Sequence, residues 1–172
     1  MQRKTRQRNY QNNENTTLTI VPANTGEVVT VNFTSFNTEA NFDALYVYDG
    51  DSTASPQLSS GNPAGSVPGG VAGGYWGTTI PGPFTSSHSS GALTFVFRSD
   101  GFTNRAGWVA DVSCSTCPPP IRVNFETSTS NTIQVSWVGL APLATSYEVI
   151  HLPAGSPAPT STDSGQIATS NP

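Results

Sequence analysis

The chain has 172 residues, 10% of them charged, and its formal net charge at pH 7 is −4. This length allows one or two small domains, each with a hydrophobic core. The acidic balance argues against nucleic acid as a partner, because phosphate binding needs clustered lysine and arginine side chains. No apolar run in the sequence approaches the length that crosses a membrane.

The only basic cluster is a terminal segment, residues 1–8, with the sequence MQRKTRQR. It is short and no basic folded face is predicted behind it, so we interpret it as a frayed terminus and not as a nucleic-acid-binding arm. No apolar segment follows it, so the sequence shows no signal peptide.

Alternation of apolar and polar residues predicts short β-strands in the first half of the chain. A first strand is expected around residues 18–20. Strands at 29–33 and 45–48 flank a polar loop, and we expect them to form an antiparallel hairpin with one buried face on each strand. Two further strands are expected at 93–97 and 108–112.

The segment between these strands, residues 52–90, is rich in glycine, proline and serine. A structureless loop of this length is unusual inside a compact domain, so we expect a short strand at residues 75–79. With little sign of helix elsewhere, the sequence predicts an all-β fold.

Two separated motifs carry a family resemblance. FTSFNTEANFDALYVYDGD, residues 33–51, and FVFRSDGFTNRAGWVADVSC, residues 95–114, resemble CUB domains in the form common in secreted bacterial proteins. YQNNE, residues 10–14, resembles the segment that follows the first strand of these domains. The resemblance implies a CUB-like antiparallel β-sandwich of jelly-roll type over residues 9–114, and a location outside the cell.

A Cys/Pro linker, residues 115–120, follows this domain, because three consecutive prolines stay extended and cannot donate to a β-ladder. Beyond it, the alternating segments IRVNF, IQVSW and YEV resemble the first half of a fibronectin type III domain. The resemblance implies an incomplete immunoglobulin-like β-sandwich over residues 121–172. A half sandwich leaves an apolar face and an open edge, so we predict that residues 118–172 are not independently stable.

The CUB resemblance also implies a calcium site formed by Glu39, Asp43 and Asp100, which match the acidic ligands of calcium-binding members. Three carboxylates at close range repel one another unless a cation lies among them. Calcium accepts about six to eight oxygen ligands, and extracellular modules bind it at roughly millimolar concentration. Phe102 departs from the family, which usually has a small polar residue there. The alternative is that Glu39 and Asp100 are solvated and that Asp43 caps a turn.

The chain has two cysteines, Cys114 and Cys117. A structural zinc site usually draws on paired Cys or His motifs, whereas His88 and His151 lie in different predicted modules. We therefore expect a disulfide, as is typical of an oxidising compartment. Either cysteine could pair with one outside this sequence, or a local bridge could join Cys114 to Cys117.

No nucleophile–base motif surrounds the serines and histidines, so the sequence predicts a protein that is not an enzyme. Tyr46, Tyr48, Tyr75 and Trp76 could form a sugar-stacking surface. We favour the alternative that the tyrosines cover a sheet face or pack under the glycine-rich loop.

These observations predict a non-catalytic extracellular binding or accessory module, calcium-assisted, from a larger secreted or cell-surface protein such as an adhesin or a hydrolase. Its partner would be an extracellular protein or glycan. The alternatives are a structural spacer without a ligand, and a carbohydrate-binding module of a secreted hydrolase.

Overall fold

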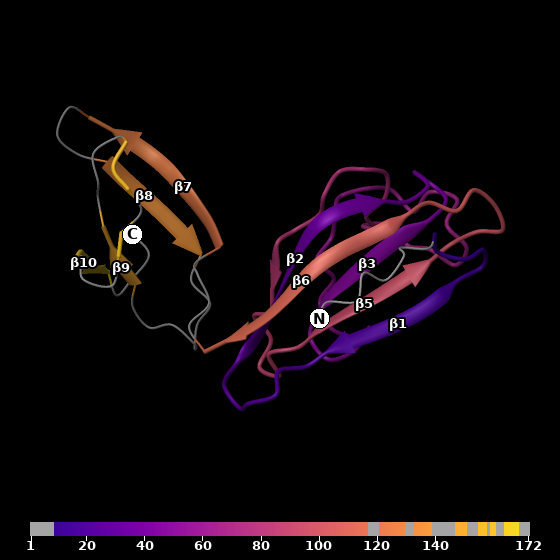
Figure 1. Ribbon diagram of the computed structural model, residues 1–172, viewed down its shortest axis with the longest axis horizontal. Helices are drawn as coiled ribbons and strands as arrows, with labels where there is room; N and C mark the ends of the chain where they lie inside the picture. Colours follow the sequence, from indigo (N-terminus) through magenta and orange to yellow (C-terminus); the bar gives the residue numbers. More distant parts are fainter. Residues whose placement is uncertain are drawn as a thin grey trace, which may run out of the picture. The chain divides into compact units, whose positions relative to one another are not determined.

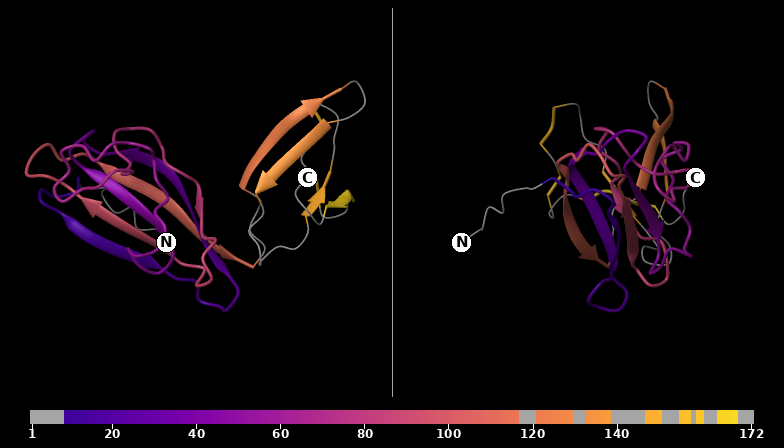
Figure 2. Two further views of the ribbon diagram at one scale, coloured as in Figure 1. Left: turned by 180° about the vertical axis from the view of Figure 1, so that it is seen from behind. Right: turned by 90° about the vertical axis from the view of Figure 1, so that its right-hand side faces the viewer.

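The computed structural model describes residues 9–116, 121–129, 133–138, 147–150, 155–157, 159–160 and 164–168. The chain divides into two compact units, with the boundary between Ser115 and Thr116. The described residues form antiparallel strands and no helix (Figures 1 and 2), which confirms the all-β prediction. Accordingly, the described part contains no helix long and apolar enough to cross a membrane.

The first sheet of unit 1 has β5 (Leu93–Arg98) at its centre. The flanking strands β1 (Asn15–Ile20) and β3 (Ala44–Asp49) both pair with β5 in antiparallel register (Figure 1). Alternating residues of these strands point toward the second sheet, as the period-two pattern of the sequence predicts.

The second sheet has β2 (Val28–Asn37) at its centre, between the two-residue strand β4 (Phe84–Thr85) and β6 (Gly107–Ser115). The β2–β6 register shifts between Phe33 and Ser35. A bulge of this kind bends a strand and increases its local twist.

A single apolar core joins the two sheets into a β-sandwich. Ring centroids of Phe36, Phe84, Phe95 and Trp108 lie 6.0–6.5 Å from that of Phe33, each with the rings steeply inclined to one another. Edge-to-face contacts of this kind suit the charge distribution of aromatic rings. The buried residues of this core are Val29, Val31, Phe33, Phe36, Leu45, Val47, Phe84, Leu93, Phe95 and Phe97.

The outer face of β3 is also buried, contrary to the expectation of one buried face. Ala44, Tyr46, Val67 and Val96 form a second buried cluster, against which Trp76 packs. Because part of the glycine-rich segment folds back over the sheet, β3 is covered on both sides.

Two local predictions were wrong. The strands at 29–33 and 45–48 do not form a hairpin, because β2 and β3 belong to different sheets and residues 38–43 cross between them. Residues 75–79 form no strand. Instead Tyr75 makes a single bridge to Leu45, and the short strand of this region is β4.

Unit 2 contains two antiparallel pairs of strands. The strand β7 (Ile121–Ser128) pairs with β8 (Ile133–Val138), and β9 (Tyr147–Val149) pairs with β10 (Gln166–Ala168). The first three lie where the sequence pattern placed strands, whereas the pattern did not predict β10. Trp137 is buried and its ring lies 6.0 Å from that of Tyr147.

Candidate metal centre

Two loops meet at one end of the unit 1 sandwich. Residues 38–43 lead into β3, and residues 99–106 follow β5. Because β3 and β5 are antiparallel neighbours, the start of one lies beside the end of the other. Glu39, Asp43 and Asp100 each offer a carboxylate oxygen here, and these oxygens all lie within 4.8 Å of one another. The structure therefore brings together the three acidic residues that the sequence predicted.

Asp43 is the most enclosed of the three, with 0% of its surface exposed. Its Oδ1 accepts a hydrogen bond from the Asp100 backbone N–H at 2.8 Å, and its Oδ2 accepts one from the Tyr10 hydroxyl at 2.5 Å. The Thr38 hydroxyl donates to the Asp43 backbone carbonyl at 3.1 Å. The Asp100 N–H and the Tyr10 hydroxyl compensate for the burial of the carboxylate and fix its orientation, and the Thr38 hydroxyl satisfies the backbone carbonyl of the same residue.

The Tyr10 hydroxyl bridges two of the acidic residues, Asp43 and Glu39. Besides donating to Asp43, its hydroxyl oxygen accepts the Glu39 backbone N–H at 3.0 Å. Its ring packs edge-on against Phe97, with centroids 5.0 Å apart. Burial and then the hydrogen bond to Asp43 raise the pKa of Tyr10 above its ordinary value, so the phenol remains a neutral donor at physiological pH.

The segment before β1 closes over the second loop. The Asn13 N–H donates to the Asp100 carbonyl at 2.7 Å, and the Tyr10 N–H donates to the Arg105 carbonyl at 3.2 Å. The Asn12 side-chain amide donates to the Gly101 carbonyl at 2.6 Å. Residues 9–14 therefore hold the position of Asp100, which no local sequence pattern indicated.

Several carboxylate oxygens remain available at this end. The Phe102 N–H donates to Oδ1 of Asp100 at 2.8 Å. Among the described residues no donor reaches Oδ2 of Asp100 or either carboxylate oxygen of Glu39, and no ion pair involves the three acids. The Phe102 side chain is 75% exposed, so this residue contributes its backbone amide and not a side-chain ligand.

The electrostatics and the chemistry of the donors fit a hard cation. Two unit charges about 4 Å apart repel by ~1 kcal/mol in bulk water and by ~4 kcal/mol near a protein surface. Unit 1 carries only two basic residues outside the terminal segment, Arg98 and Arg105, against eight acidic ones. Calcium takes oxygen ligands in flexible geometry, and backbone carbonyls and water could complete its shell.

The aromatic residues considered for sugar stacking do not form one surface. Tyr46 is 2% exposed and packs beneath the glycine-rich loop, and Tyr75 packs against the core between the sheets. Tyr48 and Trp76 are half-buried beside Tyr46. The packing of Tyr46 is the arrangement we favoured from the sequence.

Asp49, Ser86, Ser87 and His88 lie together at the other end of β3, but their contacts are those of a structural cap. Asp49 accepts the backbone N–H groups of Ser87 at 2.9 Å and of His88 at 3.2 Å, and the Ser86 hydroxyl at 3.0 Å. The Nδ1 atom of His88 accepts the backbone N–H of Ser90 at 3.1 Å. The imidazole is therefore not oriented by the carboxylate as in a catalytic triad.

The cysteine and zinc predictions fall partly outside the described residues. Cys114 is an exposed free thiol at the end of β6, so it takes part in no disulfide in the structure. Cys117 and His151 lie outside the described residues.

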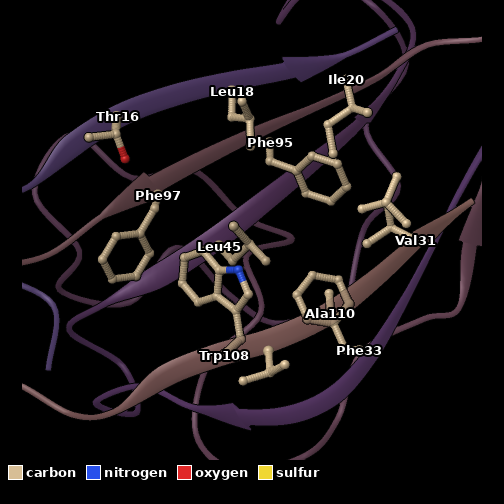
Figure 3. Close-up of a pocket in the computed structure, with 12 residues that line it drawn as sticks. Thr16, Leu18, Ile20, Val31, Phe33, Leu45, Phe95, Phe97, Trp108 and Ala110 are labelled. Carbon is tan, nitrogen blue, oxygen red and sulfur yellow. The ribbon is translucent and has the colours of Figure 1, made fainter. Parts of the chain in front are cut away.

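A cavity of about 480 Å³ opens between the two sheets (Figure 3). None of its lining side chains is titratable, so the cavity itself offers no acid–base chemistry. The lining residues are Thr16, Leu18, Ile20, Val31, Phe33, Leu45, Phe95, Phe97, Trp108, Val109, Ala110 and Val112.

In comparisons with known proteins, no family model matches the chain, and no curated protein matches it significantly in sequence.

Proposed function

We propose that unit 1 is a CUB-like, calcium-binding module that acts outside the cell as a non-catalytic binding part of a larger secreted or surface protein. The observation that carries this proposal is the approach of Glu39, Asp43 and Asp100 to within 4.8 Å, with free carboxylate oxygens and no ion pair among the described residues. The two sequence motifs that resemble CUB domains contribute all three acids, and this supports the family assignment.

Calcium would act by joining parts of the chain that are far apart in sequence. Glu39 and Asp43 come from the loop before β3, and Asp100 comes from the loop after β5. A shared cation would replace the repulsion between these loops with attraction and would fix the rim of the sandwich. Phe42 and Phe102 lie on the same two loops and are 38% and 75% exposed. This rim would offer an extracellular protein partner both apolar and acidic contacts.

The alternative of sugar binding has less support, because Tyr46 and Tyr75 are engaged in packing. The spacer alternative differs from the proposal in one measurable property, since a spacer needs no ion at this end. A calcium effect on stability therefore separates the two functions.

Glu39→Gln gives the sharpest test, because the Glu39 side chain makes no hydrogen bond with any described residue. Removing its charge should relieve repulsion and stabilise the calcium-free protein by up to ~1 kcal/mol. The same change should weaken calcium binding, because one anionic ligand is lost. Opposite signs for the two effects identify a charge role and not a loss of packing.

The measurement is thermal unfolding of the full chain, with chelator and over a calcium titration. The wild-type melting temperature should rise with calcium and level off, since a ligand at about 100 times its Kd adds about 2.7 kcal/mol of stability. Asp111→Asn is the matched control, because Asp111 is an exposed acid on β6. If ~10 mM calcium does not shift the wild-type melting temperature, the site is absent and the spacer function is favoured.

A further inference from the structure

The cavity between the two sheets is an apolar space that is open to solvent (Figure 3). It lies between β1 and β6, which are edge strands of their sheets and have no second neighbour among the described strands. Large apolar side chains of these strands are therefore exposed, with Leu18 60% and Val112 51% exposed. Apolar surface that gathers in a concave site is typical of a binding site.

The size of the cavity suits a small organic molecule. Its volume of about 480 Å³ lies within the usual range for ligand pockets, roughly 300–1,000 Å³. A cavity of about 150 Å³ with a similar apolar lining binds benzene, so this one has room for a molecule of two rings. Thr16, Leu18 and Ile20 line it along β1 over ~13 Å, at roughly 3.3 Å per residue, which favours an elongated ligand.

Two polar side-chain atoms point into this apolar space. The indole nitrogen of Trp108 extends from β6 toward the opposite sheet, and the Thr16 hydroxyl extends from β1 (Figure 3). Neither atom makes a hydrogen bond with any described residue. The indole ring is held in place by Phe36 and Phe97, whose ring centroids lie 6.0 and 5.0 Å from it. Its N–H is therefore a fixed donor that lacks an acceptor.

Water is a poor occupant of this space. At roughly 30 Å³ per molecule the cavity could hold about sixteen waters, but Thr16 and Trp108 are the only lining side chains that could bond to them. A well-held buried water needs about two to four polar partners. A mostly apolar ligand would displace this water favourably, because it buries exposed apolar surface of the protein as well as its own.

The absence of charge in the lining restricts the ligand further. No lining side chain is titratable, and a charged group moved into an apolar site without a partner is strongly unfavourable. We propose that the cavity binds a small, neutral, mostly apolar molecule with a carbonyl oxygen that accepts the Trp108 N–H. The three acidic residues of the calcium site do not line the cavity, so this binding does not depend on calcium.

Prodan, a neutral naphthalene ketone, is the probe, because its fluorescence shifts to the blue in apolar surroundings. Titration of the full chain in chelator should give a saturable blue shift with one prodan per chain. Trp108→Phe keeps an aromatic ring and removes the N–H. It should weaken prodan binding about threefold to tenfold, as expected for one neutral hydrogen bond, and should leave the binding of naphthalene, which has no carbonyl, unchanged.

Two further variants fill the cavity. Ala110→Leu and Val112→Phe add apolar volume on the inner face of β6, so each should weaken prodan binding about tenfold or more. Ser113→Leu is the matched control, because Ser113 is an exposed residue of the same strand that does not line the cavity, and it should bind as the wild type does. Thermal unfolding without prodan establishes that each variant is folded.

The proposal is overturned if the wild type shows no saturable blue shift, whatever the variants do. It is also overturned if a folded cavity-filling variant binds prodan as tightly as the Ser113→Leu control. Equal losses of prodan and naphthalene binding in Trp108→Phe would contradict the hydrogen bond to the carbonyl. Gel filtration covers the remaining case, because a dimer that does not bind prodan would show that a second copy of the chain covers the cavity.

Discussion

Replacing Tyr10 with phenylalanine should destabilise unit 1 by about 2 kcal/mol and weaken its calcium binding. The hydroxyl donates to the Asp43 carboxylate at 2.5 Å and accepts the Glu39 N–H at 3.0 Å. A hydrogen bond to a charged group contributes about 1.5–3 kcal/mol, and a neutral one about 0.5–1.5 kcal/mol. Water can replace the phenol at the half-buried Glu39 amide but not at Asp43, which is 0% exposed. We therefore expect a loss of stability near the lower end of the sum of these two contributions.

The ring of residue 10 is kept in this variant, so its edge-on contact with Phe97 should persist. The assay is urea unfolding of the full chain in chelator, followed by tryptophan fluorescence. A Trp137→Phe background restricts the signal to Trp76 and Trp108 of unit 1. For a domain of this size, 2 kcal/mol corresponds to a melting temperature lower by about 8 °C or more.

Tyr48→Phe is the matched control, because the Tyr48 hydroxyl makes no hydrogen bond with any described residue. The reasoning is refuted if the free energy of unfolding of Tyr10→Phe lies within ~0.5 kcal/mol of the wild type, the usual range for a neutral surface change. It also fails if both variants lose the same stability, since the effect would then not depend on Asp43.

Three further predictions concern packing and pH. Gly70→Ala should lower the free energy of unfolding by about 1–3 kcal/mol, because the new Cβ would lie 2.5 Å from the Tyr46 hydroxyl. Gly101→Ala is the control, because its Cβ would make only ordinary contacts, and chemical denaturation of both variants measures the difference. Phe33→Ala truncates a core side chain and should lower the free energy of unfolding by about 3–5 kcal/mol. Phe102 is 75% exposed, so Phe102→Ala should lower it by less than ~0.5 kcal/mol, and equal losses would contradict the core assignment. Burial raises the pKa of Tyr46 above 10.0, so the folded protein favours the neutral phenol. The contribution of this group to the free energy of unfolding is therefore complete below pH 10 and is lost as the pH rises further. In a pH titration followed by tyrosinate absorbance, Tyr46 should ionise only when the protein unfolds. If all five tyrosines ionise near pH 10 while the protein is still folded, the raised pKa of Tyr46 is excluded.

The positions of most strands could be predicted from the sequence. Alternation at 29–33, 45–48, 93–97 and 108–112 corresponds to β2, β3, β5 and β6. Alternation reports the two faces of a single strand, and this property is local. It does not report which strand pairs with which, so the predicted hairpin was wrong and β2 and β3 lie in opposite sheets.

The number of buried faces was likewise decided by parts of the chain far from each strand. The pattern of β3 suggested one apolar face, but the glycine-rich loop covers the other and buries Tyr46. The Nε atom of Arg98 is likewise buried, without a hydrogen-bond partner among the described residues, which no local pattern could show.

For the candidate metal centre too, the sequence indicated one part and the tertiary structure decided the other. The sequence by itself determined the three acids, Glu39, Asp43 and Asp100, because they lie within motifs that resemble one family. Only the tertiary structure decided how they are held: Tyr10 bridges the first two, and residues 9–14 hold the loop of the third. The physical reason is that strand periodicity depends on neighbouring residues, whereas hydrogen bonds across 33 positions of sequence, as between Tyr10 and Asp43, form only when the whole sandwich brings distant loops to one end.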